Sequence, residues 1–188
     1  MLLHYTSEDA TPVRVFETSA ILIYLCEQFD TDNAYLPPIK EAAHRAECMS
    51  WLLWVHGSAP YLGGGFGHFF NYAPVKIKYA IDRYTMEAKR QLDVLDRHLG
   101  EHQFLCGDSV TIADFACWPW YGECVYGDKA REFLQYDSYT NVAAWSERMK
   151  ELPSVKRGRV VNKTWGESAM KERHSASDFE EVLPNSAE

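Results

Sequence analysis

Positive charge is scarce in this chain, and long hydrophobic runs are missing. Lys and Arg together number 19 against 27 Asp and Glu, so the formal net charge is −8. That balance argues against general nucleic-acid binding, which needs basic side chains to neutralise phosphates. It also argues against binding to an anionic membrane surface, which attracts basic segments. We therefore expect neither nucleic acid nor membrane among the partners.

The sequence also lacks a Cys-x-x-Cys pair and the marks of a secretory signal. The five cysteines are an odd number without paired spacing, which indicates reduced thiols rather than a disulfide framework. The first residues have no basic start followed by a long apolar stretch. The longest apolar run near the start, residues 21–26, is far too short to span a bilayer. These absences predict a cytoplasmic protein.

What is present is apolar and aromatic. Of 188 residues, 46% are hydrophobic and 14% are aromatic, including six Trp, which excludes a disordered chain. This length can hold one domain or two small ones around a substantial core.

The order of patterns predicts a mostly α protein with a small β start. Residues 1–5 and 13–16 have strand character around a turn, and a hairpin of this size is not stable alone in water. Helical periodicity follows, interrupted by a polar linker over 30–38. The predicted domains are 1–32, an all-helical unit over 39–165, and a polar tail over 166–188. The predicted helices cover residues 17–29, 41–61, 74–99, 111–119, 129–136 and 139–152, with a last short turn from 153.

Glycine and proline predict where these helices break. Gly57 and the cluster over 60–67 should kink or interrupt the second helix. Pro74 should open the third helix at its first turn, and Pro119 should stop the short helix after residue 111.

The stretch over 106–120 predicts a buried helix that other helices pack around. Thr111 is a suitable N-cap, and Asp114 stands three residues later, where the acid of a capping box belongs. The helix is otherwise almost wholly apolar, so we expect it to be buried on all sides. We expect replacement of either capping residue by Ala to cost about 1–2 kcal/mol of stability. This stretch indicates the fold. We expect the residues that bind ligands or carry out chemistry to lie elsewhere in the chain.

Two motifs resemble the glutathione transferase family. Residues 15–25 (Val-Phe-Glu-Thr-Ser-Ala-Ile-Leu-Ile-Tyr-Leu) look like the strand and helix of that family's thioredoxin-like domain, and the capping box at 111–114 looks like the one in its helical domain. Residues 63–69, 73–84 and 116–120 are similar to the bacterial and fungal Nu class, which holds glutathione-dependent disulfide reductases.

The resemblance implies a glutathione-transferase C-terminal helical bundle preceded by a partial thioredoxin-like remnant of two strands and a helix. The implied activity uses glutathione as co-substrate to reduce small disulfides or peroxides, or to conjugate electrophiles, in a homodimer. Met1 falls where the family's chain has just passed its cis-proline, beyond the thiol-activating residue. We therefore expect a fragment, a misassigned start or a decayed paralogue, with impaired activity. The alternative is a non-catalytic scaffold or protein-interaction module.

Glu17 and Thr18 open the first predicted helix, where backbone N–H groups favour a carboxylate. The resemblance implies that Glu17 pairs with the ammonium of glutathione's γ-glutamyl group and that Thr18 donates to its carboxylate. An ordinary helix start with a first-turn acid is the alternative.

The resemblance also implies that Arg83 contacts glutathione, because its fork suits a carboxylate. The alternative is a solvated basic stripe paired with nearby acids. His56 could line a cleft between the domains or be structural. His98 and His102 have metal-like spacing without a third ligand, so we predict no metal site. No cysteine has a clear activating base beside it, so we predict no catalytic protein residue.

Overall fold

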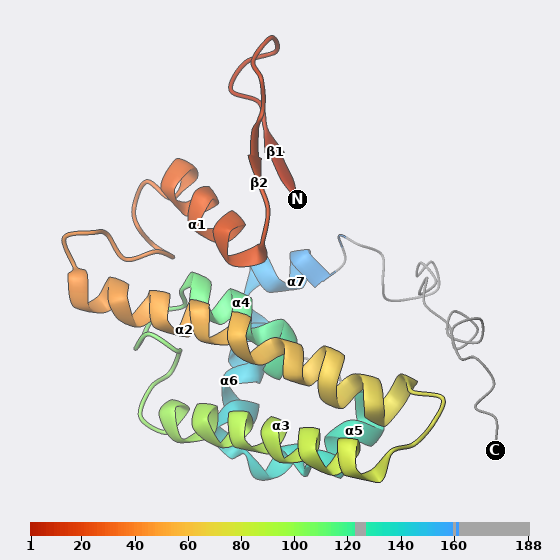
Figure 1. Cartoon of the computed structure of the whole chain (residues 1–188). Coiled ribbons are helices and arrows are strands. Elements are labelled where there is room, and N and C mark those ends of the chain that lie inside the picture. Colours follow the sequence, from red (N-terminus) through yellow and green to blue (C-terminus); the bar gives the residue numbers. More distant parts are fainter. Residues whose placement is uncertain (123–126, 160, 162–188) are drawn as a thin grey trace.

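The computed structural model describes residues 1–122, 127–159 and 161, and the predicted tail over 166–188 lies outside them. The predicted fold class is confirmed: a hairpin stands on a body of helices (Figure 1). Strands β1 (Leu2–His4) and β2 (Val13–Val15) pair antiparallel, with Leu2 opposite Val15. No helix among the described residues is long and apolar enough to cross a membrane.

Helix α1 (Thr18–Phe29) joins the hairpin to the helical body. The His4 ring Nδ1 lies 2.7 Å from the Tyr24 hydroxyl, which ties β1 to α1. The other face of α1 packs against α2 (Ala42–Pro60) and α4 (Ile112–Tyr121).

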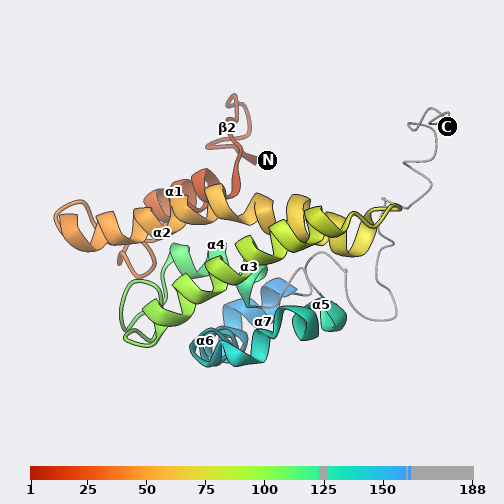
Figure 2. The ribbon, with the colours of Figure 1, turned by 60° about the horizontal axis from the view of Figure 1, so that its bottom comes forward.

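The helical body consists of two long helices covered by shorter ones. Helices α2 and α3 (Lys78–Leu99) run side by side in both ribbon views (Figures 1 and 2). Helix α4 packs against α2 and α6 (Thr140–Glu151), and α6 also packs against α3. The remaining elements are α5 (Gly127–Leu134), the 3₁₀ turn η2 (Tyr136–Ser138) and α7 (Pro153–Arg159). The core includes Leu52, Leu62, Leu92, Leu95, Ile112 and Trp145.

At the glycine-rich segment, where the sequence predicts a kink or an interruption, the second helix changes type without a gap. Helix α2 passes through Gly57 to Pro60 and continues directly as a π-helix, η1 (Tyr61–Tyr72). The N–H of Ala73 still donates to the His68 carbonyl at 2.7 Å, a spacing of five residues. A Cβ on Gly65 would lie 2.4 Å from the Tyr84 ring, so this glycine lets η1 pack closely on α3.

The predictions for two prolines are wrong. Helix α3 begins at Lys78 rather than at Pro74, because Ile77 is extended and Lys76 donates from Nζ to the Phe70 carbonyl at 2.7 Å. Pro119 lies inside α4, which continues to Tyr121. Proline removes one N–H from the helix interior but does not end a helix that tertiary contacts hold at its C-terminus.

Helix α4 has the predicted capping box. The N–H of Thr111 donates to Asp114 Oδ2 at 2.9 Å, and the reciprocal bond to the Thr111 side chain is present. Asp114 is fully buried and also accepts the Leu105 N–H and the Trp145 indole N–H, each at 2.9 Å. Burial raises the pKa of the Asp114 carboxyl, and these hydrogen bonds oppose the rise. The helix is not buried on all sides, since Trp120 is half-buried.

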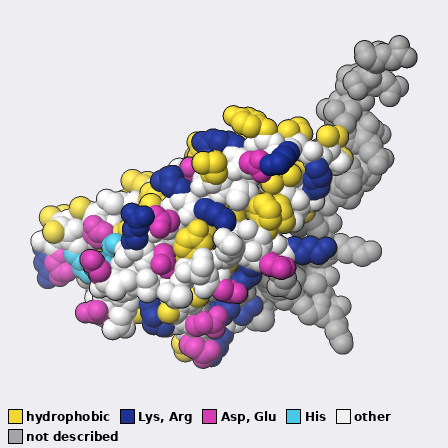
Figure 3. Space-filling model, turned by 90° about the horizontal axis from the view of Figure 1, so that it is seen from below, with side chains coloured by type: hydrophobic (Ala, Val, Ile, Leu, Met, Phe, Trp, Pro, Cys, Tyr) yellow, Lys and Arg dark blue, Asp and Glu magenta, His cyan; other side chains and the backbone are white. Residues whose placement is uncertain are grey.

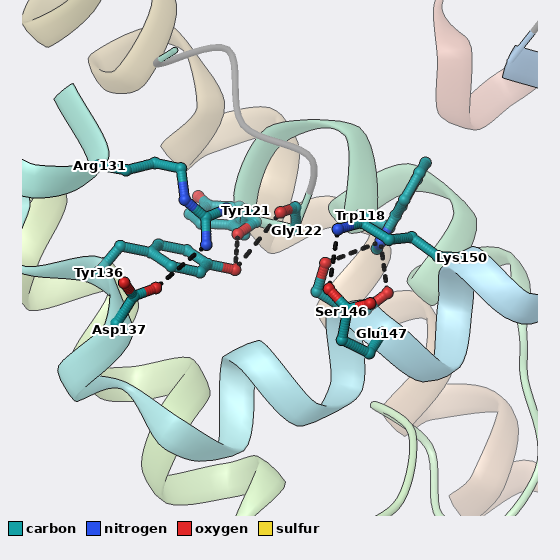
Figure 4. A network of polar contacts seen from close by, with 9 residues as sticks. All are labelled: Trp118, Tyr121, Gly122, Arg131, Tyr136, Asp137, Ser146, Glu147 and Lys150. Carbon is teal, nitrogen blue, oxygen red and sulfur yellow. Dashed lines mark hydrogen bonds and ion pairs between the residues drawn. The ribbon is translucent and has the colours of Figure 1, made fainter. Parts of the chain in front are cut away.

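Figure 4 shows how the C-terminal end of α4 is held. The Tyr136 hydroxyl donates to the Tyr121 carbonyl at 2.7 Å, which satisfies a carbonyl that has no partner within the helix. The Arg131 guanidinium lies 4.1 Å from the centre of the Tyr136 ring. On α6, Ser146 accepts the Trp118 indole N–H at 3.2 Å through its carbonyl. Side-chain contacts therefore fix both ends of α4. The helix also packs against α1 and α2.

Candidate functional site

A cavity of about 210 Å³, named here the α1 cavity, opens where α1, α2 and α4 meet. The N-terminus of α1 supplies its polar side, and α2 and α4 supply its apolar walls. Of the predicted site residues, the structure brings Glu17, Thr18 and His56 together here. The cavity is lined by Glu17, Thr18, Ser19, Val55, His56, Ala59, Pro60, Ala116 and Trp120.

Glu17 occupies a strained position at the rim of this cavity. Its φ angle of 70° lies in the left-handed region, which residues with a Cβ rarely adopt. Its carbonyl accepts the first helical bond, from the Ile21 N–H at 2.9 Å, while its side chain makes no capping bond. Both Glu17 and Thr18 are exposed. Strain of this kind costs about 1–3 kcal/mol and is concentrated at functional sites.

His56 contacts the N-terminus of α1 through the next residue. The N–H of the buried Ser19 donates to His56 Nε2 at 3.3 Å, and the Ser19 hydroxyl lies 3.4 Å from the Leu52 carbonyl. Nε2 therefore acts as the acceptor, which leaves the ring proton on Nδ1. The histidine thus fixes α1 against α2 at the point where Glu17 and Thr18 face the cavity.

Trp120 forms a wall of the cavity that the sequence analysis missed. It comes from the α4 stretch to which only a structural role was given, so the expectation that this stretch carries no part of the site is wrong. A Cβ on Gly63 would lie 3.0 Å from the Trp120 ring, so Gly63 leaves room for the indole. The sequence feature that could have indicated this wall is Trp120 itself, a large aromatic residue directly after Pro119 at the exposed end of an otherwise buried helix.

Arg83 does not line the α1 cavity. Its guanidinium lies on the outer side of α3, 4.0 Å from Glu87, which also pairs with Arg90 at 2.6 Å. These pairs lower the pKa of Glu87, mainly through its hydrogen bond with Arg90. Similar pairs join Lys78 to Asp82 and Arg97 to Asp93. In this arrangement Arg83 belongs to the ion-paired stripe that was the alternative to a ligand role.

The two histidines with metal-like spacing are occupied by the backbone. His98 Nε2 lies 2.8 Å from the Leu105 carbonyl, and His102 Nδ1 lies 3.0 Å from the His98 carbonyl. Each of these nitrogens donates a proton and so offers no lone pair. Among the described residues no three potential ligands cluster.

The α1 cavity combines the first turn of α1, the Glu17 carboxylate, the hydroxyls of Thr18 and Ser19, and an indole wall. The N–H groups of that turn and the Thr18 hydroxyl suit a carboxylate, and Glu17 suits an ammonium. Together they suit a ligand end that carries both charges, next to an apolar part that can lie on Trp120.

Comparisons with known proteins show which family this chain resembles. The glutathione S-transferase C-terminal domain matches residues 78–148. The chain is 55% identical to disulfide-bond oxidoreductase YghU of Escherichia coli, over 90% of this chain and 58% of that protein. It is 30% identical to glutathione S-transferase 2 of Schizosaccharomyces pombe, over 82% of this chain and 70% of that protein.

The fold is also shared with a solved structure. Glutathione transferase YghU of Streptococcus pneumoniae, crystallised with glutathione, matches with a TM-score of 0.77 and 46% identity, over 85% of this chain and 59% of that one. The chain therefore spans somewhat under two thirds of the length of these two YghU proteins. The matched sequence, the matched fold and the capped α4 lead to one conclusion: the chain belongs to the glutathione S-transferase family.

Proposed function

We propose that this protein binds glutathione at the α1 cavity and belongs to an enzyme that uses glutathione to reduce small disulfides or peroxides, or to conjugate electrophiles. The observation that carries the proposal is the α1 N-terminus, where Glu17 and Thr18 face a cavity walled by Trp120. In this proposal residues 1–32 bind glutathione, and the helical unit over 39–165 faces the second substrate.

The chemistry follows from the charges of glutathione. Glu17 pairs with the ammonium of the γ-glutamyl group, while Thr18 and the α1 N–H groups donate to its carboxylate. The attacking thiolate belongs to glutathione, so the protein's task is to hold glutathione, lower the pKa of its thiol and place it against the second substrate. We retain Arg83 as a proposed partner of a glutathione carboxylate, reached if its 4.0 Å contact with Glu87 opens.

We assign His56 a positioning role in this site. It touches Ser19 and so sets where the α1 N–H groups point. His56→Ala should weaken glutathione binding several-fold, whereas His56→Gln keeps a side-chain acceptor and should restore most of it. Calorimetric titration with glutathione measures both, and equal affinities of the wild type and the Ala variant would remove the role.

Titration of the 188-residue chain with glutathione tests the central proposal. We expect measurable binding, weaker in Arg83→Ala and unchanged in Arg97→Ala, whose partner Asp93 lies on the same helix. Equal affinities for the Arg83 variant and wild type would remove Arg83 from the site. Glutathione-dependent reduction of a small disulfide should be very weak or absent, and robust turnover would contradict that expectation.

A non-catalytic role is the second candidate, and the exposed apolar surface of the hairpin and α1 favours it. Met1 is 78% exposed and Phe29 is 61% exposed, and Phe16 is also exposed. Such a surface suits a protein partner. If glutathione does not bind at millimolar concentration, this second candidate replaces the first.

We propose a homodimer in the cytoplasm as the assembled state. Large apolar side chains are exposed on α2, η1 and α3 and in the turn between η1 and α3, and Figure 3 shows such side chains between charged ones on one face. They include Leu53, Tyr61, Tyr72, Val75, Ile77, Tyr79 and Met86. Sedimentation analysis should give twice the chain mass, and Tyr79→Glu should lower it. The described cysteines are free thiols, which suits a reducing compartment.

A further inference from the structure

Two cysteines outside the α1 cavity lie where α2 meets the capped start of α4. Cys48 lies in the middle of α2 and is fully buried. Cys106 lies in the loop before α4 and is only partly buried. Both are free thiols, and we call them the thiol pair.

One set of contacts fixes Cys106 over α2. The Cys106 carbonyl lies 3.0 Å from His44 Nε2, which donates to it. His44 precedes Cys48 by four residues, so both side chains lie on the same face of the helix, one turn apart. The loop that carries Cys106 is therefore anchored one turn from Cys48.

A second set of contacts comes from the capping box. The Thr111 hydroxyl lies 3.4 Å from Cys106 Sγ. The Thr111 hydroxyl and the Ala113 N–H, at the start of α4, also lower the pKa of the Cys48 thiol. Residues at the start of α4 therefore lie close to both cysteines.

The surroundings of the two thiols shift their pKa values in opposite directions. Hydrogen bonding from Cys106 is the largest influence on Cys48 and lowers the pKa of its thiol to about 7. The same bond and burial raise the pKa of Cys106. A thiolate at a helix N-terminus is stabilised by the N–H groups there. The lowered pKa of Cys48 favours loss of one proton from the pair, and the raised pKa of Cys106 opposes loss of the second.

We propose that Cys48 and Cys106 form a redox-active dithiol that is oxidised to an intramolecular disulfide by small disulfides such as glutathione disulfide. Cys106 is the entry point because its side chain is partly exposed. A cavity of about 370 Å³ on this side is lined by His44 and Thr111, the residues that hold Cys106. This site does not depend on the α1 cavity.

The reaction balances in two exchange steps. The Cys106 sulfur attacks one sulfur of the small disulfide while its proton passes to Cys48, and the first small thiolate leaves. Cys48 then loses that proton and attacks the Cys106 sulfur, which expels the second thiolate. One proton of the pair ends on a departing thiol, and the other departing thiolate takes the proton that the pair had lost to solvent. The protein loses two electrons, and the small disulfide gains them.

Peptide mapping of the folded chain after exposure to glutathione disulfide tests the proposal. The wild-type chain should become about 2 Da lighter, with the peptides of Cys48 and Cys106 linked and the link removed by a reductant. Glu17→Ala should show the same link, which separates this result from the proposed glutathione site. Folded wild-type protein that keeps both thiols free, or that carries lasting glutathione on Cys106, would overturn the proposal.

Variants sharpen the order of the two steps. In Cys48→Ser, glutathione should stay on Cys106, a gain of about 305 Da, because no second thiol resolves it. In Cys106→Ser, the buried Cys48 should remain unmodified. The control Cys117→Ser should form the wild-type link, since Cys117 is fully buried and burial raises its pKa. Lasting glutathione on Cys48 in the Cys106 variant would reverse the assigned order.

Discussion

Helices α1 and α4 begin in opposite ways, although both present backbone N–H groups at their first turn. At α4 the first turn is capped: the Ile112 N–H donates to the Tyr35 carbonyl at 3.0 Å. Thr111 and Asp114 form the capping box, and the Asp114 carboxylate is fully buried and accepts three N–H donors. At α1 the side chain of Glu17 makes no capping bond, the residue is exposed, and its φ angle of 70° is strained.

This difference separates stability from binding. Unpaired N–H groups at a helix start are satisfied by side chains, by water or by a ligand. At the start of α4, side chains of the same segment pair with the backbone groups, so we expect this helix start to contribute to the stability of the fold. The α1 start lies at a cavity, where the Ser19 N–H donates to His56 and no side chain of Glu17 caps the helix. We infer that changes at α4 alter stability, whereas changes at α1 alter ligand affinity.

The largest expected effect is that of Asp114→Ala. The change leaves the N–H groups of Leu105 and Thr111 and the Trp145 indole without an acceptor in the core, which should cost about 3 kcal/mol or more. Denaturant unfolding measures this loss. Asp108→Ala in the same loop, where the side chain is exposed, is the control and should change stability by less than about 0.5 kcal/mol. Similar losses in both variants would show that Asp114 is not the centre of this network.

A smaller effect is expected for Thr111→Ala. The capping hydroxyl is lost while Asp114 keeps its other donors, so we expect a cost of about 1–2 kcal/mol with glutathione affinity unchanged. Thr18→Ala at α1 is the matched test: stability should change by less than about 0.5 kcal/mol, and glutathione affinity should fall. If Thr111→Ala weakened glutathione binding as much as Thr18→Ala does, the separation of the two helix starts would be wrong.

The sequence was most informative where local rules decide the structure. The Thr111 and Asp114 spacing specified the capping box, and the strands and most helices appeared within a few residues of their predicted bounds. It failed where tertiary contacts override local preference. Pro119 stays inside α4, where Ser146 holds the Trp118 indole before it and Tyr136 holds the Tyr121 carbonyl after it. The glycine-rich segment changes the helix type but leaves no gap, because Gly65 lets it pack closely on Tyr84.

The candidate site was predictable only in part. Glu17 and Thr18 follow from their place at a helix start, but the contact between Ser19 and His56 joins residues 37 apart in sequence. The strain at Glu17 has no sequence signal, since glycine is the residue that usually marks a positive φ. The thiol pair likewise joins Cys48 to a loop almost sixty residues later, and no local pattern relates them. Long-range pairing of this kind becomes visible only in the fold.

The sharpest test of the comparison is at Glu17, where the expected effect on stability is below those of the two α4 variants. Glu17→Ala removes the carboxylate but keeps a Cβ at a φ of 70°, whereas Glu17→Gly removes both. Because glycine adopts positive φ without steric cost, the Gly variant should be more stable than the Ala variant by about 1 kcal/mol. Both should lose glutathione affinity, measured by titration, to a similar extent. A Gly variant no more stable than the Ala variant would mean that position 17 is unstrained, and α1 would then begin as an ordinary helix does.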